Sequence, residues 1–311
     1  MATRLAGMAQ RTGFPNNGKA FQRVIRESLV GQPDPLLEEK KALASDFTNA
    51  SVREITFKQA RDVILQFVWL GNMGTTTHST GLFFGSHLAG VVCFGSTAGT
   101  NVAASVCGEE HKHEVITLVR GTCAHWAHPH SASFLISAAC KQMTEKGYHA
   151  FVSYSDVEAG EVGTVYQSTG WTYCGKTQPS EKYITIDGRV HDSRQIHGLT
   201  RDRTGGNLRY TRTRAEQRQI LIEEGCQFFM GEAKHRYVGI YGDRRMKCVL
   251  RKALQWKTFP YPKRPVVAAA VGQSLTLIPT TEPDTRPVQS SVSLHLEDAT
   301  LANENAPRDE K

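Results

Sequence analysis

A strand–helix–strand unit in the middle of the chain limits the possible folds most strongly. Residues 114–120 and 149–155 are rich in β-branched and other apolar side chains, and each predicts a strand. Between them a helix is expected to begin at Ser131 or Ser133, either of which can cap it, and to end before Gly147. Because such a crossover joins parallel neighbours, the two strands should lie side by side in one sheet.

Further elements flank this unit. Residues 56–70 carry apolar side chains at helical spacing with charged ones between them, which predicts an amphipathic helix. Residues 81–84 and 88–94 are β-rich, and the three residues between them suit a tight hairpin. A short helix at 163–169 and a strand from 171 complete the order. The sequence therefore predicts an α/β (α+β) fold with a mixed central sheet flanked by helices.

Composition divides the chain into four parts. Residues 1–50 are polar and contain Gly and Pro; we expect them to be partly disordered, with one short helix near 21–29 and no chemistry. Residues 51–190 should form the core, and residues 191–264 a basic extension that packs on it. Residues 265–311 lack periodicity and are expected to form a disordered tail.

Positive charge is concentrated in the second half of the chain. The net charge is +7, and eight arginines stand between Arg189 and Arg218 against three acidic residues. A polyanion is one explanation and a solvated surface is the other. Further along, basic residues flank aromatic ones, which suits phosphate contacts and stacking on an extruded base, although the same segment could be a strand and an amphipathic helix of the core. The predicted nucleic-acid contacts are Arg236, Tyr237, Arg244, Arg245, Lys247, Arg251 and Lys263.

Cysteine spacing and hydropathy indicate the compartment. The seven cysteines are scattered and form no Cys-x-x-Cys pair, which is typical of reduced thiols in a cytoplasm rather than of a zinc ribbon or a disulfide framework. The first residues contain no apolar run of signal-peptide length, and no window resembles a membrane span. We therefore expect neither export nor a membrane partner.

Four polar side chains stand at the ends of predicted elements. Arg120 ends the first strand of the crossover and Ser133 lies near the start of the following helix, at the edge where α/β sheets bind ligands. Arg120 can clamp a phosphate or carboxylate, whereas Ser133 can position a substrate or cap the helix. Asp156 follows the second strand and Tyr166 lies on the short helix; they can transfer protons or share a metal ion, or be a turn residue and a core residue.

These motifs form an ordered series that resembles the Mom family, phage proteins that modify adenine in DNA to a carbamoylmethylated base. The short helix with its tyrosine, followed by Gly170 and Trp171, also resembles the GNAT acyltransferases. The resemblance covers about residues 54–264, and it is carried by residues 116–120, 133–137, 152–156, 163–171, 186–191 and 234–263.

The resemblance implies a GNAT-like fold and an active site lined by Arg120, Ser133, Asp156 and Tyr166. It also implies iron, with Asp156 and Tyr166 as the ligands here. Where the family often has a His-Tyr pair this chain has Val68-Trp69, so His78 is the remaining candidate for a further ligand. Residues 121–131 lack the Gly-x-Gly turn that cradles the pyrophosphate of coenzyme A, which argues against acetyl-CoA as a cofactor.

The function implied by the resemblance is conversion of adenine in double-stranded phage DNA to its N6-carbamoylmethyl form. The modified DNA would resist host restriction nucleases, and the enzyme would act in the cytoplasm of the infected bacterium. Two alternatives stay open. One is a GNAT acyltransferase that uses acetyl-CoA on a protein or small-molecule amine, and the other is a DNA-binding protein without catalytic activity.

Overall fold

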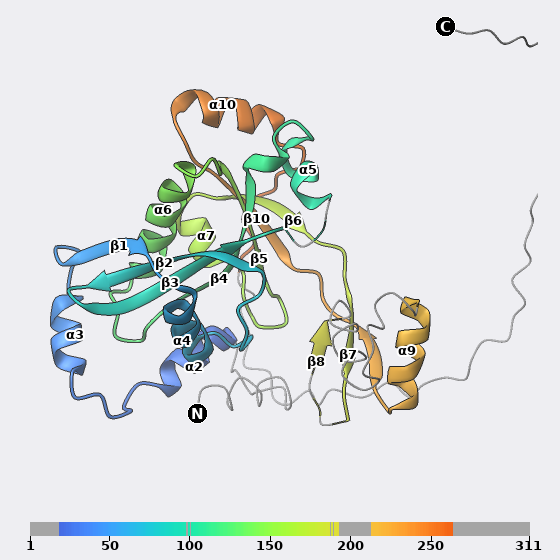
Figure 1. Cartoon of the computed structure of the whole chain (residues 1–311), viewed down its shortest axis with the longest axis horizontal. Helices are drawn as coiled ribbons and strands as arrows, with labels where there is room; N and C mark the ends of the chain where they lie inside the picture. Colours follow the sequence, from blue (N-terminus) through green and yellow to red (C-terminus); the bar gives the residue numbers. More distant parts are fainter. Residues whose placement is uncertain are drawn as a thin grey trace, which may run out of the picture. The chain divides into compact units, whose positions relative to one another are not determined.

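A seven-stranded mixed sheet organises the structure, a computed structural model that describes residues 19–97, 99, 101–186, 188, 190–192 and 213–263 (Figure 1). The chain divides into a unit of residues 1–266 and a second unit of residues 267–311, which lies outside the described residues together with the predicted tail. In spatial order the strands are β1 (Ala50–Glu54), β2 (Thr76–Phe84), β3 (His87–Gly95), β4 (Val115–Cys123), β5 (Ala150–Ser155), β10 (His235–Ile240) and β6 (Thr172–Lys176).

The predicted crossover is confirmed. Strands β4 and β5 pair in parallel and are joined through α6 (Ser131–Thr144), whereas the other neighbours in the described sheet are antiparallel. The hairpin between β2 and β3 is also confirmed, with Gly85 at a φ of 58° in its turn. The predicted capping of α6 is wrong, because Ser131 is already helical and the cap position is His130, whose side chain makes no capping bond.

Helices cover both faces of the sheet. Alternate residues of a strand point to opposite faces, so Val92 and Phe94 of β3 pack with α6, while Val91 and Cys93 pack with α4 (Phe57–Phe67). Thr56 and Gln59 form the capping box that begins α4. The other helices are α2 (Phe21–Ser28), α3 (Leu37–Leu43), α5 (Val102–Cys107), the 3₁₀ turn η1 (Lys112–Glu114), α7 (Thr164–Ser168), α9 (Arg214–Glu223) and α10 (Arg244–Ala253).

A second, three-stranded sheet follows the first. Its strands are ordered β8 (Val190–Asp192), β7 (Glu181–Ile184) and β9 (Gln227–Met230), and they pack with α9 around Tyr183, Leu221 and Cys226. The main sheet does not end at residue 190, where the sequence suggested a boundary, because β10 lies between β5 and β6. Tyr237 and Val238 of β10 are fully buried, so this strand is part of the core rather than an extension packed on it.

The helices of the described residues are short compared with the thickness of a membrane. The longest helix among the described residues is α6, with 14 residues, and within that part of the chain none is long and apolar enough to cross a bilayer.

Candidate functional site

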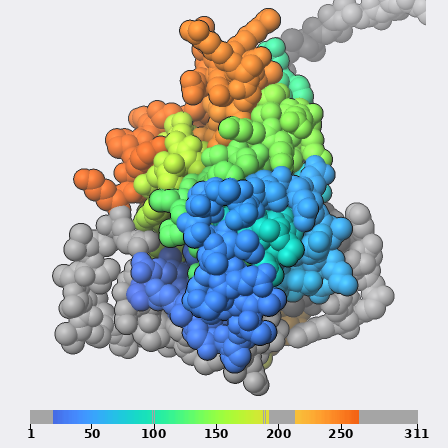
Figure 2. Space-filling view, turned by 90° about the vertical axis from the view of Figure 1, so that its left-hand side faces the viewer, coloured from blue at the N-terminus to red at the C-terminus, as the bar shows by residue number. Residues whose placement is uncertain are grey.

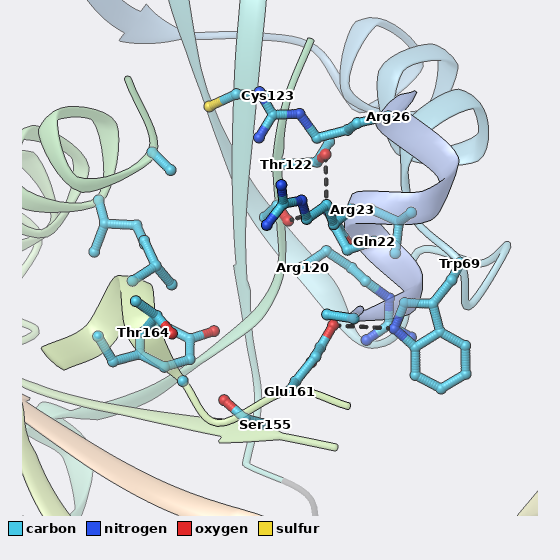
Figure 3. Close-up of a pocket in the computed structure, with 18 of the residues that line it drawn as sticks. Gln22, Arg23, Arg26, Trp69, Arg120, Thr122, Cys123, Ser155, Glu161 and Thr164 are labelled. Atoms are coloured by element: carbon cyan, nitrogen blue, oxygen red, sulfur yellow. Dashed lines mark hydrogen bonds between the residues drawn. The ribbon is translucent and has the colours of Figure 1, made fainter. Parts of the chain in front are cut away.

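A cavity of about 820 Å³ opens where β4 and β5 separate (Figure 3). The two strands pair only over Val115–Thr117 and Ala150–Val152, so their later residues diverge and leave space between them. Residues 118–123 of β4, residues 153–155 of β5 and the start of α6 line the cavity. It therefore lies at the carboxyl ends of the parallel strands, where α/β sheets commonly bind ligands.

Helix α2 forms a wall of this cavity, although the sequence predicted no chemistry for the lead-in that contains it. The side-chain amide of Gln22 donates to the Gly121 carbonyl at 3.2 Å and to Thr122 Oγ1 at 2.8 Å. Arg26 donates to the Ala124 carbonyl at 3.3 Å, and both Arg23 and Arg26 line the cavity. The predicted short helix is confirmed, but the expectation that it takes no part in the site is not supported by where it lies.

Arg120 lies in the lining, as its position at the strand end suggested. Its Nε donates to the Asn72 carbonyl at 2.8 Å, one terminal nitrogen donates to Asn72 Oδ1, and the other donates to the Val119 carbonyl at 2.5 Å. The guanidinium packs against Gly74, where the Cβ of any larger residue would lie 3.3 Å from Arg120 Nη2. Burial lowers the pKa of Arg120, yet an arginine keeps its charge, so the site holds a fixed cation.

Tyr166 also lines the cavity, with its ring packed near Trp171 and Tyr237 at centroid distances of 5.1 and 5.4 Å. Its phenol oxygen lies 2.7 Å from Ser153 Oγ, which in turn lies 3.1 Å from the Leu118 carbonyl. Burial raises the pKa of Tyr166 above its ordinary value. The phenol is therefore neutral near pH 7 and is engaged in this chain of hydrogen bonds.

Asp156 is not part of the cavity lining, although its neighbour Ser155 is. The residue is 6% exposed, and its carboxylate lies 3.0 Å from Lys234 Nζ and accepts a hydrogen bond from the Glu158 backbone at 3.0 Å. These contacts fix the turn after β5 and attach it to the segment before β10. The structure thus places Asp156 as a turn residue behind the site, the second of the two interpretations that the sequence allowed.

Ser133 lies on the first turn of α6 but is not part of the cavity lining, to which the helix contributes Ala132, Leu135 and Ile136 instead. Its hydroxyl donates to the His130 carbonyl at 3.0 Å. The side chain therefore bonds within its own helix rather than with the other candidate residues.

Glu161, which the sequence patterns did not single out, projects into the cavity wall close to Arg120 and Trp69 (Figure 3). Its Oε1 accepts a hydrogen bond from the Trp69 indole at 3.2 Å, and its Oε2 accepts one from the Asp156 backbone at 3.4 Å. Burial, reinforced by the nearby Asp156 carboxylate, raises the pKa of Glu161 to about 7. Trp69, which bonds to Glu161, stands where the Mom family often has part of its His-Tyr pair. This departure from the family pattern was the sequence feature that could have drawn attention to this part of the site.

The residues present do not fit the iron site that the resemblance implied. The Asp156 carboxylate is paired with Lys234, and the Tyr166 phenol is bonded to Ser153. His78 lies on β2 outside the cavity lining, with its ring against Tyr148 and 2.9 Å from Thr77 Oγ1. Among the described residues, three or more His, Cys, Asp or Glu side chains do not come together as a metal site would require.

The turn that precedes α6 does not fit a pyrophosphate cradle either. The His130 backbone N–H donates to His128 Nδ1 at 3.2 Å, the Ser131 N–H donates to the His128 carbonyl at 2.9 Å, and Pro129 has no N–H. These bonds occupy the N–H groups of His130 and Ser131, so the turn itself offers no backbone donor to an anion, as a Gly-x-Gly cradle would.

The predicted nucleic-acid contacts separate into two groups. Tyr237 is fully buried and bonded to the Val162 carbonyl, so its prediction as a stacking residue is wrong. Arg236 is half-buried, with its guanidinium over the Trp256 ring and bonded to the Cys174 carbonyl. The remaining residues belong to α10 or to the end of the described chain: Arg244, Arg245, Arg251 and Lys263 are exposed, and Lys247 is half-buried.

Helix α10 and the cavity lie at opposite ends of β4 and β5. Leu250 of α10 packs with Val115 and Ala150, the first residues of these strands, whereas the cavity is at their last residues. Figure 2 agrees, since the orange side chains of α10 project from the end opposite to the blue N-terminal helices. The nine residues of β4 correspond to roughly 30 Å.

The chain was compared with solved structures, curated proteins and protein-family models. Similar solved structures are an acetyltransferase of Bacillus subtilis in complex with CoA (10% identity, 62% of this chain and 99% of that chain, TM-score 0.32) and an N-acetyltransferase of Staphylococcus aureus Mu50 (11%, 62% and 99%, 0.34). A third is a spermidine N-acetyltransferase of Vibrio cholerae (10%, 62% and 94%, 0.34). None of the curated proteins matches. The model of the Mom protein family matches residues 49–263, and the chain therefore belongs to the Mom protein family.

Proposed function

We propose that this protein transfers a carbamoylmethyl group to the N6 amine of adenine in DNA. The observation that carries the proposal is the cavity between β4 and β5. Its volume of about 820 Å³ is within the range of small-molecule sites, and its lining combines apolar residues such as Leu135 and Ile136 with the fixed charge of Arg120. A planar base with one reacting amine suits such walls, and membership of the Mom family supports the choice of adenine.

The reaction is a substitution at the carbon of a carbamoylmethyl donor that carries a leaving group. The N6–C bond forms while the bond from carbon to the leaving group breaks, the leaving group keeps the electron pair, and N6 loses one proton. Arg120 suits the stabilisation of the negative charge that develops on the leaving group, because its donors are oriented by Asn72 before any ligand binds. In a duplex the amine is base-paired, so the adenine has to be extruded into the cavity.

The exposed cations of α10 suit contacts with DNA phosphates. Val115 at the start of β4 packs with Leu250 of α10, and the cavity lining begins at Leu118, so about three residues of β4, or roughly 10 Å, separate α10 from the near edge of the cavity. A duplex that lies along this side of the protein can therefore contact α10 while its extruded base enters the cavity near Arg23 and Arg26. The product is phage DNA that resists host nucleases, made in the cytoplasm of the infected bacterium.

Nucleoside analysis tests the proposed reaction. DNA from bacteria that express the protein is hydrolysed to nucleosides and examined by mass spectrometry, and a deoxyadenosine heavier by one carbamoylmethyl group is the expected result. Restriction digestion of the same DNA should show protection. If only ordinary nucleosides were found while a known Mom protein was active in parallel, the proposal would fail, and an acetylated amine would point instead to acyl-CoA chemistry.

Charge reversal on α10 tests the DNA contact. Arg244→Glu with Arg251→Glu should lower affinity for a short duplex and reduce the slope of log K against log salt by about 2, because each lost phosphate contact lowers that slope by about 1. Fluorescence anisotropy over a series of salt concentrations measures both quantities. Lys41→Glu with Arg53→Glu changes the same number of charges on α3 and β1, and equal effects of the two variants would contradict a specific role of α10.

A further inference from the structure

Among the described residues, two carboxyl groups line the cavity, and their surroundings differ. Glu27 of α2 forms ion pairs with Lys19 at 2.7 Å and with Arg23 at 2.9 Å. Glu161 forms hydrogen bonds only to neutral groups, the Trp69 indole and the Asp156 backbone, and it has no ion pair within the described part of the chain. Glu161 is therefore the lining carboxyl group that is available to a ligand.

Trp69 and the turn after β5 hold Glu161 from two sides. Each oxygen of the carboxyl group accepts one N–H, at 3.2 Å from Trp69 and at 3.4 Å from Asp156, and each keeps acceptor capacity. The turn itself is attached elsewhere, because Glu158 pairs with Lys182 and Asp156 with Lys234. The carboxyl group thus has a fixed position in the wall and free lone pairs.

Charged groups on several elements act on Glu161. The backbone N–H of Asp156, after β5, lowers the pKa of Glu161 by hydrogen bonding, whereas the Asp156 charge raises it and the charge of Lys234, before β10, lowers it. Arg120 of β4 and Tyr166 of α7 also interact with it electrostatically. Together with burial these groups bring the pKa of Glu161 to about 7, so a substantial fraction is ionised at neutral pH and can accept a proton.

We propose that Glu161 is the catalytic base that removes the proton from N6 of adenine, and that Trp69 is the residue that positions it. This inference rests on the proposed function. As the N6–C bond forms, the N6 proton moves to a carboxylate oxygen of Glu161, and the resulting carboxylic acid returns that proton to solvent after product release. An indole N–H only donates, so Trp69 orients the carboxylate and is not a metal ligand.

Variants of Glu161 test the catalytic role. Glu161→Gln keeps the shape of the side chain but cannot take up the proton, so the amount of modified deoxyadenosine should fall at least about 10²-fold. Glu181→Gln is the matched control, because Glu181 lies on β7 and pairs with Arg218 outside the cavity. Modification by Glu161→Gln at the level of the wild type would overturn the proposal.

Infrared titration of the purified protein tests the positioning role independently of turnover. A carboxyl band should titrate near pH 7 in the wild type and in Glu181→Gln, and it should be missing in Glu161→Gln. The midpoint should rise in Trp69→Phe and in Lys234→Met, which remove groups that favour the ionised form, and fall in Asp156→Asn, which removes a repelling charge. Midpoints that do not move in any of the three variants would refute the assigned surroundings.

The yields of the wild type and of Glu161→Gln distinguish failure of the proposed function from failure of the role assigned to Glu161. If the wild type produces no modified base, the proposed function and the role of Glu161 in it both fail. If the wild type and Glu161→Gln produce it equally, only the inference fails. Iron that copurifies at one atom per wild-type chain and is lost in Glu161→Gln would make the carboxylate a metal ligand and would also overturn the inference.

Discussion

Arg120→Ala is expected to lower the amount of modified deoxyadenosine by on the order of 10³-fold. A guanidinium that is already fixed at a water-poor site stabilises developing negative charge more strongly than mobile water does, and its loss is felt mainly in the transition state. Three of its hydrogen bonds, to Asn72 and Val119, hold the group before any ligand arrives. Mass spectrometry of nucleosides from cells with equal amounts of folded protein measures the effect.

Two further variants show which property of Arg120 matters. Arg120→Lys keeps the positive charge but loses the planar fork that contacts Asn72, so an intermediate loss of about 10²-fold is expected. Arg61→Ala removes an exposed arginine from α4 and should leave the yield unchanged. If Arg120→Ala modified DNA as well as Arg61→Ala does, Arg120 would have no part in the reaction.

Gly239→Ala is expected to destabilise the protein by about 3 kcal/mol, near the upper end for overpacking of a core. Gly239 lies on β10, and a Cβ there would approach the Trp171 ring to between 2.4 and 2.7 Å. Trp171 is 1% exposed and packs near Phe151 and Tyr166, so its rigid ring has no space to move. Differential scanning calorimetry should show a melting temperature lower by roughly 6–12 °C for a domain of this size.

Gly121→Ala is the matched control, because it adds the same methyl group to another strand of the same sheet. A Cβ at Gly121 would meet its nearest atoms at 3.5 Å or more, which is ordinary van der Waals contact. Its stability should be equal to that of the wild type or slightly higher, since alanine restricts the unfolded chain more than glycine does. Equal melting temperatures for the two variants would show that the Trp171 ring can move to accommodate the added methyl group and that the core around β10 is loosely packed.

Local patterns in the sequence predicted the elements that are continuous in the chain. The spacing of apolar residues and the helix-start and helix-end signals predicted α4 and α6, and the β-rich runs around Gly85 predicted the hairpin. The strand–helix–strand crossover predicted that β4 and β5 pair in parallel. The direction of β4 placed Arg120 at the carboxyl end of the strand, where the cavity lies. These predictions held because each depends on the period of a helix or strand, which a few neighbouring residues determine.

The same local patterns did not predict the surroundings of residues whose role depends on contacts with distant parts of the chain. Tyr237 stands among basic residues, which suggested a surface, yet its neighbours in space are Tyr166 and Tyr173 and it is fully buried. Asp156 follows a strand, as a catalytic carboxylate often does, but its carboxylate forms an ion pair with Lys234. Neither partner could be assigned from the sequence, because nothing near Tyr237 or Asp156 in the chain indicates which strand it will face.

The sequence by itself thus determined the order of the elements, the membership of the Mom family and the arginine at the end of β4. Tertiary structure alone decided that β10 enters the sheet between β5 and β6, that α2 forms a wall of the cavity, and that Glu161 meets Trp69 across 92 residues. The physical reason is range. Periodicity indicates which face of an element is apolar. The distant partner against which that face is buried is determined only when the whole core packs. Burial then raises the pKa of Glu161.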